Sequence, residues 1–272
     1  MKYFLLYLFF AVIINNTYAE TFDDYIDRVE MYLDEDRYHE ALASANEAIR
    51  INPNSAKAYR YLGISYFYLG DTDASLKYLH HAVELESTYS DAYINLANVY
   101  ASIREYDRAL ENYNSAIYHD PENDRYYARR AYILGVMGDF ERAILDYNEA
   151  IRLNGRNVEY FNHRGILHFV LRRDIDALID FTRAIMYYYI DFGLKDFALH
   201  LHRGSAHFNL EMYDQALEDF TLAIELNPGH KQTYELRARV YRQLANMTDD
   251  FVQRNNYLQL AQDDLKAAET LE

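Results

Sequence analysis

The stretch from Ala56 to Tyr89, AKAYRYLGISYFYLGDTDASLKYLHHAVELESTY, decides the fold because its pattern returns along the rest of the chain. Within it, Ala82 stands 34 residues after one alanine and 34 residues before the next. The spacing holds over five alanines and then lengthens twice, giving the series Ala48, Ala82, Ala116, Ala150, Ala184, Ala223 and Ala268. A fixed period of this length indicates a repeat protein whose units stack on one another.

A second series of small residues precedes the first by seven positions. It consists of Ala41, Ser75, Ala109, Ala143, Ala177, Ala216 and Ala261. All three prolines, Pro53, Pro121 and Pro228, follow the later alanine by five residues, where they would end a helix. Apolar residues at i, i+3, i+4 and i+7 predict two amphipathic helices per repeat. The small residues let the helix backbones approach closely, and aromatic side chains fill the remaining volume.

These features resemble the tetratricopeptide family, whose repeat is 34 residues long. The repeats are numbered from Phe22, Ala56, Ser90, Asp124, Val158, Phe197 and Lys231. The aromatic of repeat position 4 is matched in every repeat but the sixth, which has His200, and the Leu-Gly pair of positions 7 and 8 survives as Leu62-Gly63. The resemblance implies an all-α fold, a right-handed superhelical solenoid of seven helix–turn–helix repeats over residues 20–272. Its first helices would line a concave groove.

Two irregularities break the period. Additional residues, Phe192 to Asp196, separate the fifth and sixth repeats, and the last repeat is lengthened near Ala245 to Asn256. The second insertion contains Asn246-Met247-Thr248, which is a glycosylation acceptor if the host glycosylates secreted proteins. The sequence does not settle the host.

The N-terminus has the order of a secretory signal. Lys2 is followed by an unbroken apolar run from Tyr3 to Ile14 and then by polar residues that lead to Ala19. Twelve apolar residues are too few for a comfortable membrane span, which needs about 20. We therefore expect residues 1–19 to be a signal peptide cleaved after Ala19, with an uncleaved anchor as the alternative. The mature protein would be secreted or periplasmic.

Composition limits the classes of partner and of chemical site that the protein can have. The chain of 272 residues carries a formal net charge of −16, which disfavours nucleic acid and anionic lipid as partners. It contains no cysteine, so disulfides, thiolate zinc sites and cysteine nucleophiles are excluded.

Arginine and aspartate occur together at two positions of the repeat. Position 7 is arginine and position 23 is aspartate in each of the last four repeats, giving Arg130 with Asp146, Arg164 with Asp180, Arg203 with Asp219 and Arg237 with Asp264. The second repeat has Leu62 and Tyr78 at these positions. Both positions lie eight residues from the turn, so they should meet at the same height on antiparallel helices. We interpret the pairs as partly buried ion pairs that lock each hairpin, the alternative being an arginine row offered to a ligand.

No pattern of catalytic or metal-ligating residues stands out. Five histidines gather in the fifth and sixth repeats: His163, His168, His200, His202 and His207. His163 and His202 hold the same position in adjacent repeats, about 8–10 Å apart, which is too far for one zinc ion. The histidines therefore predict core or groove packing. No nucleophile–base constellation or phosphate loop appears, so the chain is predicted not to be an enzyme and to need no cofactor or metal.

The candidate site is a basic, tyrosine-flanked groove on the concave face that the resemblance implies. Its residues are Lys57, Arg60, Tyr61, Phe67, Asn95, Asn98, Arg125, Arg129 and Tyr132. Arg60, Asn95, Arg125 and Arg129 partly resemble the carboxylate clamp with which some tetratricopeptide proteins hold an acidic C-terminus. Ile64 replaces the first asparagine of that clamp, and arginines stand where lysines are usual.

The sequence thus predicts a non-enzymatic protein–protein interaction scaffold in an extracytoplasmic compartment. Its groove would bind an extended peptide or partner protein, with acidic residues or a free C-terminus on the bound segment. Two alternatives remain: a small-ligand or glycan-binding protein that uses the tyrosine-rich groove, or an accessory subunit of an envelope enzyme complex. The partner and the oligomeric state are left open.

Overall fold

The computed structural model describes residues 20–271, so the expected signal peptide lies outside the described residues. Within that range the chain forms fourteen α-helices and no strand. They divide into two compact units, an N-terminal unit that ends at Pro121 and a C-terminal unit that begins at Glu122. None of the described helices is both long and apolar enough to cross a bilayer.

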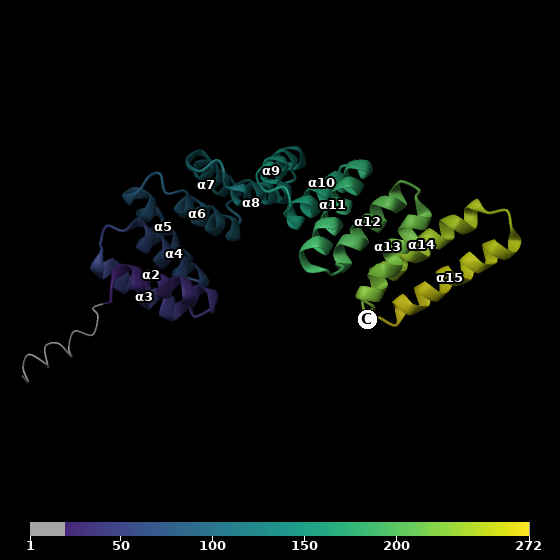
Figure 1. Ribbon diagram of the computed structural model, residues 1–272, viewed down its shortest axis with the longest axis horizontal. Helices are drawn as coiled ribbons and strands as arrows, with labels where there is room; N and C mark the ends of the chain where they lie inside the picture. Colours follow the sequence, from purple (N-terminus) through teal and green to yellow (C-terminus); the bar gives the residue numbers. More distant parts are fainter. Residues whose placement is uncertain (1–19, 272) are drawn as a thin grey trace, which may run out of the picture. The chain divides into compact units, whose positions relative to one another are not determined.

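Each unit is a row of antiparallel helix hairpins, which can be followed along the chain in Figure 1. The helices of the N-terminal unit are α2 (Phe22–Asp34), α3 (Tyr38–Ile51), α4 (Ala56–Tyr68), α5 (Thr72–Leu85), α6 (Ser90–Ser102) and α7 (Tyr106–His119). Those of the C-terminal unit are α8 (Asp124–Val136), α9 (Phe140–Leu153), α10 (Val158–Val170), α11 (Asp174–Phe192), α12 (Phe197–Asn209), α13 (Tyr213–Leu226), α14 (Lys231–Met247) and α15 (Phe251–Glu269). The first helix of every hairpin begins at the residue from which its repeat was numbered.

The turn inside each of the first six hairpins has the same backbone geometry. Repeat position 15 is left-handed in all of them, at Asp36, Gly70, Arg104, Gly138, Arg172 and Glu211, with φ between 58° and 84°. In the second repeat the Gly70 N–H donates to Phe67 O at 3.0 Å, and the Asp71 N–H donates to Tyr66 O at 3.0 Å. This pair of backbone bonds closes the helix end. The turn therefore tolerates Asp, Arg and Glu as well as glycine.

The additional residues between the fifth and sixth repeats lengthen a helix. α11 has 19 residues, whereas the corresponding helices α3, α5, α7, α9 and α13 have 14. Gly193 ends α11 with φ 65°, and its N–H donates to Tyr189 O at 2.8 Å. The extra residues of the last repeat lengthen α14 and α15 in the same manner.

The core lies where the alanine series meets large aromatic side chains. Ala48, Ala116 and Ala184 have no exposed surface, and Phe181 and Phe220 are at most 1% exposed. Close approach is demanding at Gly63 and Gly165, where an added Cβ would lie 2.7 Å from Leu79 and from the Phe181 ring respectively. The sequence prediction of small residues beside large aromatics is confirmed here.

All four arginine–aspartate pairs are formed, and all four lie in the C-terminal unit. Arg164 Nε donates to Asp180 Oδ2 at 2.8 Å and Arg164 Nη2 donates to Asp180 Oδ1 at 2.6 Å. The same two-bond geometry joins Arg130 to Asp146, Arg203 to Asp219 and Arg237 to Asp264. The aspartates are buried, so the interpretation as hairpin locks is confirmed.

Candidate functional site

The predicted groove residues fall on both sides of the boundary at Pro121. Six of them belong to the N-terminal unit and three to the C-terminal unit. Each set therefore forms a surface of its own, and the two surfaces are described separately below.

In the N-terminal unit the two predicted cations are engaged by neighbouring side chains. Lys57 Nζ lies 3.4 Å from Glu30 Oε1, and the Tyr61 hydroxyl donates a hydrogen bond to the same carboxylate. Arg60 Nη1 donates to Asn95 Oδ1 at 3.4 Å, and the guanidinium stacks 4.2 Å from the centroid of the Tyr61 ring. These groups are used to join repeats one, two and three.

The remaining predicted residues of this unit are also committed to internal contacts. Asn98 Oδ1 accepts a hydrogen bond from the Tyr113 hydroxyl at 2.8 Å. Phe67 and Asn95 line a small hollow of about 60 Å³ beside Asn98. A hollow of this size holds no more than a side-chain tip, so this surface offers little room for a ligand.

The C-terminal unit carries a hollow of about 470 Å³ between α8 and α10, beside the predicted residues of this unit. Arg125, Arg129 and Tyr132 stand on α8, and Tyr132 is 56% exposed. Arg125 and Arg129 are both exposed, and neither forms an ion pair with any residue of the described chain. All three of the predicted residues of this unit are therefore brought together at one opening.

Aromatic and polar side chains complete the wall of the hollow. The Tyr160 hydroxyl donates to Asp124 Oδ2 at 2.7 Å, and Asn154 Nδ2 donates to the same oxygen at 3.0 Å. Burial raises the pKa of Tyr160, and the hydrogen bond to Asp124 raises it further. Burial also raises the pKa of Tyr147. Both phenols are therefore neutral hydrogen-bonding groups near neutral pH.

The hollow continues into an apolar recess of about 200 Å³. Tyr132, Tyr147 and His163 belong to both cavities, and Val136, Ile166 and Leu167 line the recess alone. The His163 ring lies 6.5 Å from the Tyr132 ring and 5.9 Å from the Tyr147 ring, measured between centroids. The site thus changes from charged at the N-terminal ends of α8 and α10 to apolar toward their C-terminal ends.

Some residues of this site were not assigned to it from the sequence, although a signal for them exists. Glu159 and His163 stand at positions 2 and 6 of the fifth repeat, as Arg125 and Arg129 do in the fourth. His163 was predicted to pack in the core or the groove, and extending the same two positions by one repeat would also have found Glu159. Tyr147 and Tyr160 are almost fully buried, and no sequence pattern indicated that they would share in the wall.

The histidines of the fifth and sixth repeats pack as predicted, in the core or along the groove. His202 Nδ1 lies 2.9 Å from Asn162 Oδ1, and burial lowers the pKa of His202. His163 lines the hollow, and burial lowers its pKa as well. Across residues 20–271, no three His, Cys, Asp or Glu side chains are arranged to hold a metal ion.

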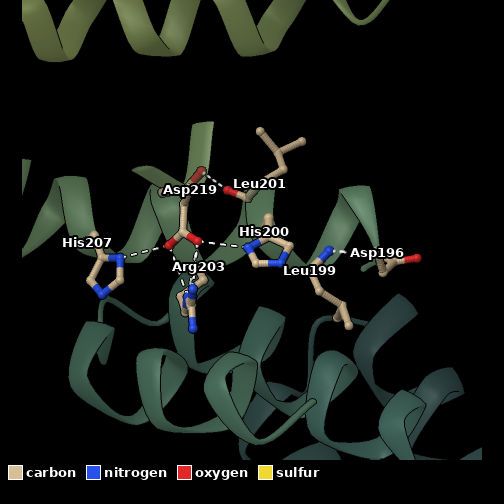
Figure 2. A network of polar contacts seen from close by, with 8 residues as sticks. Asp196, Leu199, His200, Leu201, Arg203, His207 and Asp219 are labelled. Carbon is tan, nitrogen blue, oxygen red and sulfur yellow. Dashed lines mark hydrogen bonds and ion pairs between the residues drawn. The ribbon is translucent and has the colours of Figure 1, made fainter. Parts of the chain in front are cut away.

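The sixth repeat adds two histidines to its arginine–aspartate pair. His200 Nδ1 lies 2.9 Å from Asp219 Oδ1 and His207 Nδ1 lies 3.0 Å from Asp219 Oδ2, with Arg203 on the same carboxylate (Figure 2). Burial alone would raise the pKa of Asp219, but hydrogen bonds from His200, His207 and Arg203 hold it well below its usual range. Because Asp219 is 2% exposed, this network stabilises the hairpin and is closed to a substrate.

A row of two-helix hairpins with an open, side-chain-lined hollow defines a helical-repeat binding scaffold. Family models described as tetratricopeptide repeat match residues 27–79, 90–123, 124–157 and 197–230, which together make up more than half of the chain. The chain belongs to the tetratricopeptide repeat family. Proteins of this family generally act as non-enzymatic scaffolds that bind other proteins, and this chain is a protein-interaction scaffold.

Solved structures support the fold. The C-terminal part of a repeat-containing protein from Cytophaga hutchinsonii is similar with a TM-score of 0.70 and 16% identity, covering 91% of this chain and 96% of its own. Pseudomonas aeruginosa pilF has a TM-score of 0.59 and 20% identity, over 80% of this chain and 97% of its own. MamA has a TM-score of 0.55 and 18% identity, over 61% of this chain and 97% of its own. A comparison of the sequence with curated proteins gives no match.

Proposed function

We propose that the scaffold binds an extended segment of a partner protein in the hollow between α8 and α10. An acidic side chain or a free C-terminal carboxylate of that segment contacts Arg125 and Arg129. The observation that carries the proposal is the pair of exposed guanidinium groups, which lack an ion-pair partner in the described chain. Arginine forks bind carboxylates with two parallel hydrogen bonds, which makes a carboxylate the fitting partner.

The apolar recess supports a peptide rather than a lone anion. Val136, Ile166 and Leu167 offer an apolar surface beside Tyr132, where a neighbouring side chain of the same segment can be buried. Because the charges are exposed, the affinity is expected to be modest and to fall with ionic strength.

The test begins with affinity capture from the native compartment, followed by peptide arrays that cover the captured proteins. The double variant Arg125→Glu/Arg129→Glu removes two attractions and adds two repulsions, so binding should weaken by about 1–3 kcal/mol while helicity is kept. The charge-matched control is Lys195→Glu/Arg242→Glu, which reverses two exposed cations outside the hollow that have no ion pair in the described chain. Unchanged binding by the first variant across ionic strengths would reject the proposal.

The N-terminal surface provides a second control. Arg60→Glu reverses a cation that is already bonded to Asn95 and stacked on Tyr61. We expect it to lower stability more than it lowers partner binding. A loss of binding equal to that of the Arg125→Glu/Arg129→Glu variant would assign the partner to the N-terminal unit instead.

A small carbohydrate is the second candidate ligand, and the aromatic wall favours it. Tyr132, Tyr147, Tyr160 and His163 all border the hollow, and its volume falls within the range of small-molecule sites. Calorimetry with oligosaccharides separates the two functions. Saccharide binding that survives the Arg125→Glu/Arg129→Glu change would favour the carbohydrate.

We further propose that the scaffold acts in an extracytoplasmic compartment. The support is the order of Lys2, the apolar run from Tyr3 to Ile14, and Ala19. N-terminal sequencing of the mature protein should begin at Glu20. Intact Met1 in a membrane fraction would instead indicate an uncleaved anchor.

A further inference from the structure

The hollow between α8 and α10 has two walls of opposite charge. Arg125 and Arg129 stand on the α8 wall, and Glu159 stands on the facing α10 wall. Glu159 is exposed and, like the two arginines, forms no ion pair in the part of the chain that is described. The other carboxylate of the lining, Asp124, accepts hydrogen bonds from Tyr160 of α10 and from Asn154, two uncharged donors that hold it toward the α10 side of the hollow.

The unpaired charges line one hollow, and they act in opposite directions on its two buried phenols. Burial is the main cause that raises the pKa of Tyr147, the Glu159 carboxylate raises it further, and the Arg129 guanidinium lowers it. At Tyr160, burial and the hydrogen bond to Asp124 raise the pKa most, while Arg125 and Glu159 again act in opposite directions. A ligand that enters the hollow therefore meets a positive wall on one side and a negative wall on the other.

An extended peptide matches such a pair of walls in a particular way. Its successive side chains point in opposite directions, so neighbouring residues face opposite walls. A purely acidic segment would place one carboxylate on the arginines and the next one toward Glu159, where the like charges repel. An acidic residue beside a basic one satisfies both walls at once.

We propose that the hollow selects an extended segment in which an acidic and a basic residue are adjacent. The acidic side chain lies against Arg125 and Arg129, and the basic side chain lies against Glu159. This inference rests on the proposed function of the hollow and specifies the charge pattern of its ligand.

The probe is an array of decapeptides that carry every combination of Glu, Gln and Lys at two adjacent central positions, each in several apolar and Gly/Ser contexts. For the unaltered protein we expect peptides with one Glu and one Lys to bind best, peptides with Glu and Gln to bind about two- to five-fold more weakly, and peptides with two Glu to bind more weakly again. The preference should shrink as salt is added.

Two variants test the assignment to Glu159. Glu159→Gln should abolish the preference for Lys over Gln yet keep the dependence on Glu, and Glu159→Lys should make the peptides with two Glu the best ligands. The matched control Glu225→Gln changes an exposed glutamate of α13 outside the hollow and should keep the original order.

The possible failures are distinguishable. Binding that requires Arg125 and Arg129 but ignores the neighbouring Lys would overturn this inference and leave the proposed function standing. Binding of no peptide at all, or binding unaffected by Arg125→Glu/Arg129→Glu, would overturn both. Binding of free amino acids as tightly as of peptides would assign the hollow to a small zwitterion instead.

Discussion

The two units close their hairpins with different chemistry at the same repeat positions. In the C-terminal unit, positions 7 and 23 are a partly buried arginine and a buried aspartate in all four repeats, as in Arg164 and Asp180. In the N-terminal unit, Leu62 is buried and Tyr78 stacks on Tyr66, with 5.4 Å between ring centroids. The third repeat likewise has a buried leucine, Leu96, at position 7.

The difference teaches that the hairpin does not require an ion pair. An apolar pair of suitable volume fills the same space, and replacing buried ion pairs by packed apolar residues is often neutral or stabilising. The ionic lock nevertheless makes the C-terminal unit sensitive to the loss of a single partner and to acid. The predictions that follow exploit this contrast.

The largest effect is expected when one partner of an ionic lock is removed. Asp180→Ala leaves the Arg164 guanidinium without its carboxylate, with Asn148 Oδ1 at 2.6 Å as its other hydrogen-bond partner. An uncompensated buried charge costs about 3–5 kcal/mol. Urea unfolding followed by circular dichroism measures the loss, and Asp176→Ala, an exposed aspartate on the same helix, is the control.

Converting the lock to the chemistry of the N-terminal unit should reverse most of this loss. The double variant Arg164→Leu/Asp180→Tyr introduces the residues found at Leu62 and Tyr78. Recovery of much of the stability would show that the two chemistries are interchangeable. Additive losses in the double-mutant cycle would show that the two positions are energetically independent.

A smaller effect is expected from adding a methyl group where the two helices of a hairpin approach most closely, at the small residue of repeat position 8. In Gly165→Ala the new Cβ would lie 2.7 Å from the Phe181 ring and 3.2 Å from Asp180 Cβ, so we expect a loss of about 1–3 kcal/mol. In Gly63→Ala of the N-terminal unit the new Cβ would lie 2.7 Å from Leu79 Cγ and 3.2 Å from Ser75 O. Leu79 is fully buried, but it can change rotamer where the rigid Phe181 ring cannot, so the loss should be somewhat smaller.

The control for this pair is Gly135→Ala, whose Cβ would meet only Leu167 Cδ2 at an ordinary 3.5 Å. Alanine is the better helix former, so this change should stabilise the protein by up to about 1 kcal/mol. Thermal unfolding of the three variants measures the order of their stabilities. Equal losses at Gly63 and Gly165 would mean that both units pack with the same rigidity.

Acid should weaken the C-terminal unit more than the N-terminal unit. Burial lowers the pKa of His163, His168 and His202 in the former and of His80 in the latter. A histidine with a lowered folded-state pKa binds fewer protons folded than unfolded. Its stabilisation is complete above the unfolded pKa of about 6.5 and is lost as the pH falls through the folded-state value.

Asp219 of the sixth repeat should cause a further loss of stability of the C-terminal unit at lower pH. Its folded-state pKa is depressed, so its stabilising effect is present above about pH 4 and is lost only in stronger acid. Hydrogen exchange at pH 7 and pH 5, corrected for the intrinsic rates, should show protection falling first in residues 122–271. Parallel loss in both units would contradict the assignment to these histidines.

The smallest effect concerns the end of the C-terminal unit. In α15 only Ala261, Asp264 and Ala268 are buried, whereas Phe251 and Val252 are 75% and 76% exposed. We therefore expect the first half of α15 to fray before any other helix of this unit, because so few of its side chains are buried. Hydrogen exchange that finds residues 251–260 among the best protected would reject this expectation.

The sequence was sufficient for the architecture because the evidence for it is periodic. A 34-residue spacing of alanines identifies the family. The joint occurrence of arginine at repeat position 7 and aspartate at position 23, as in Arg164 and Asp180, identifies a contact within a hairpin. Both signals come from comparing the chain with itself. They carry over directly to the structure, where the helices begin at the numbered residues and the ionic locks are formed.

The candidate site was less predictable because it depends on which side chains satisfy one another across repeats. Lys57 and Arg60 look as available in the sequence as Arg125 and Arg129. Only the structure shows Lys57 beside Glu30 and Arg60 on Asn95. The repeat pattern likewise contains no sign of the division at Pro121, which separates residues that the sequence grouped into one groove.

The ionic locks also bear on the order in which the hairpins form. Three of them join residues 16 positions apart, whereas Arg237 and Asp264 are 27 apart because α14 and α15 are longer. Closing the longer loop costs roughly 0.5 kcal/mol more chain entropy. The final hairpin should therefore assemble last during refolding, and pulse-labelling would detect its late protection.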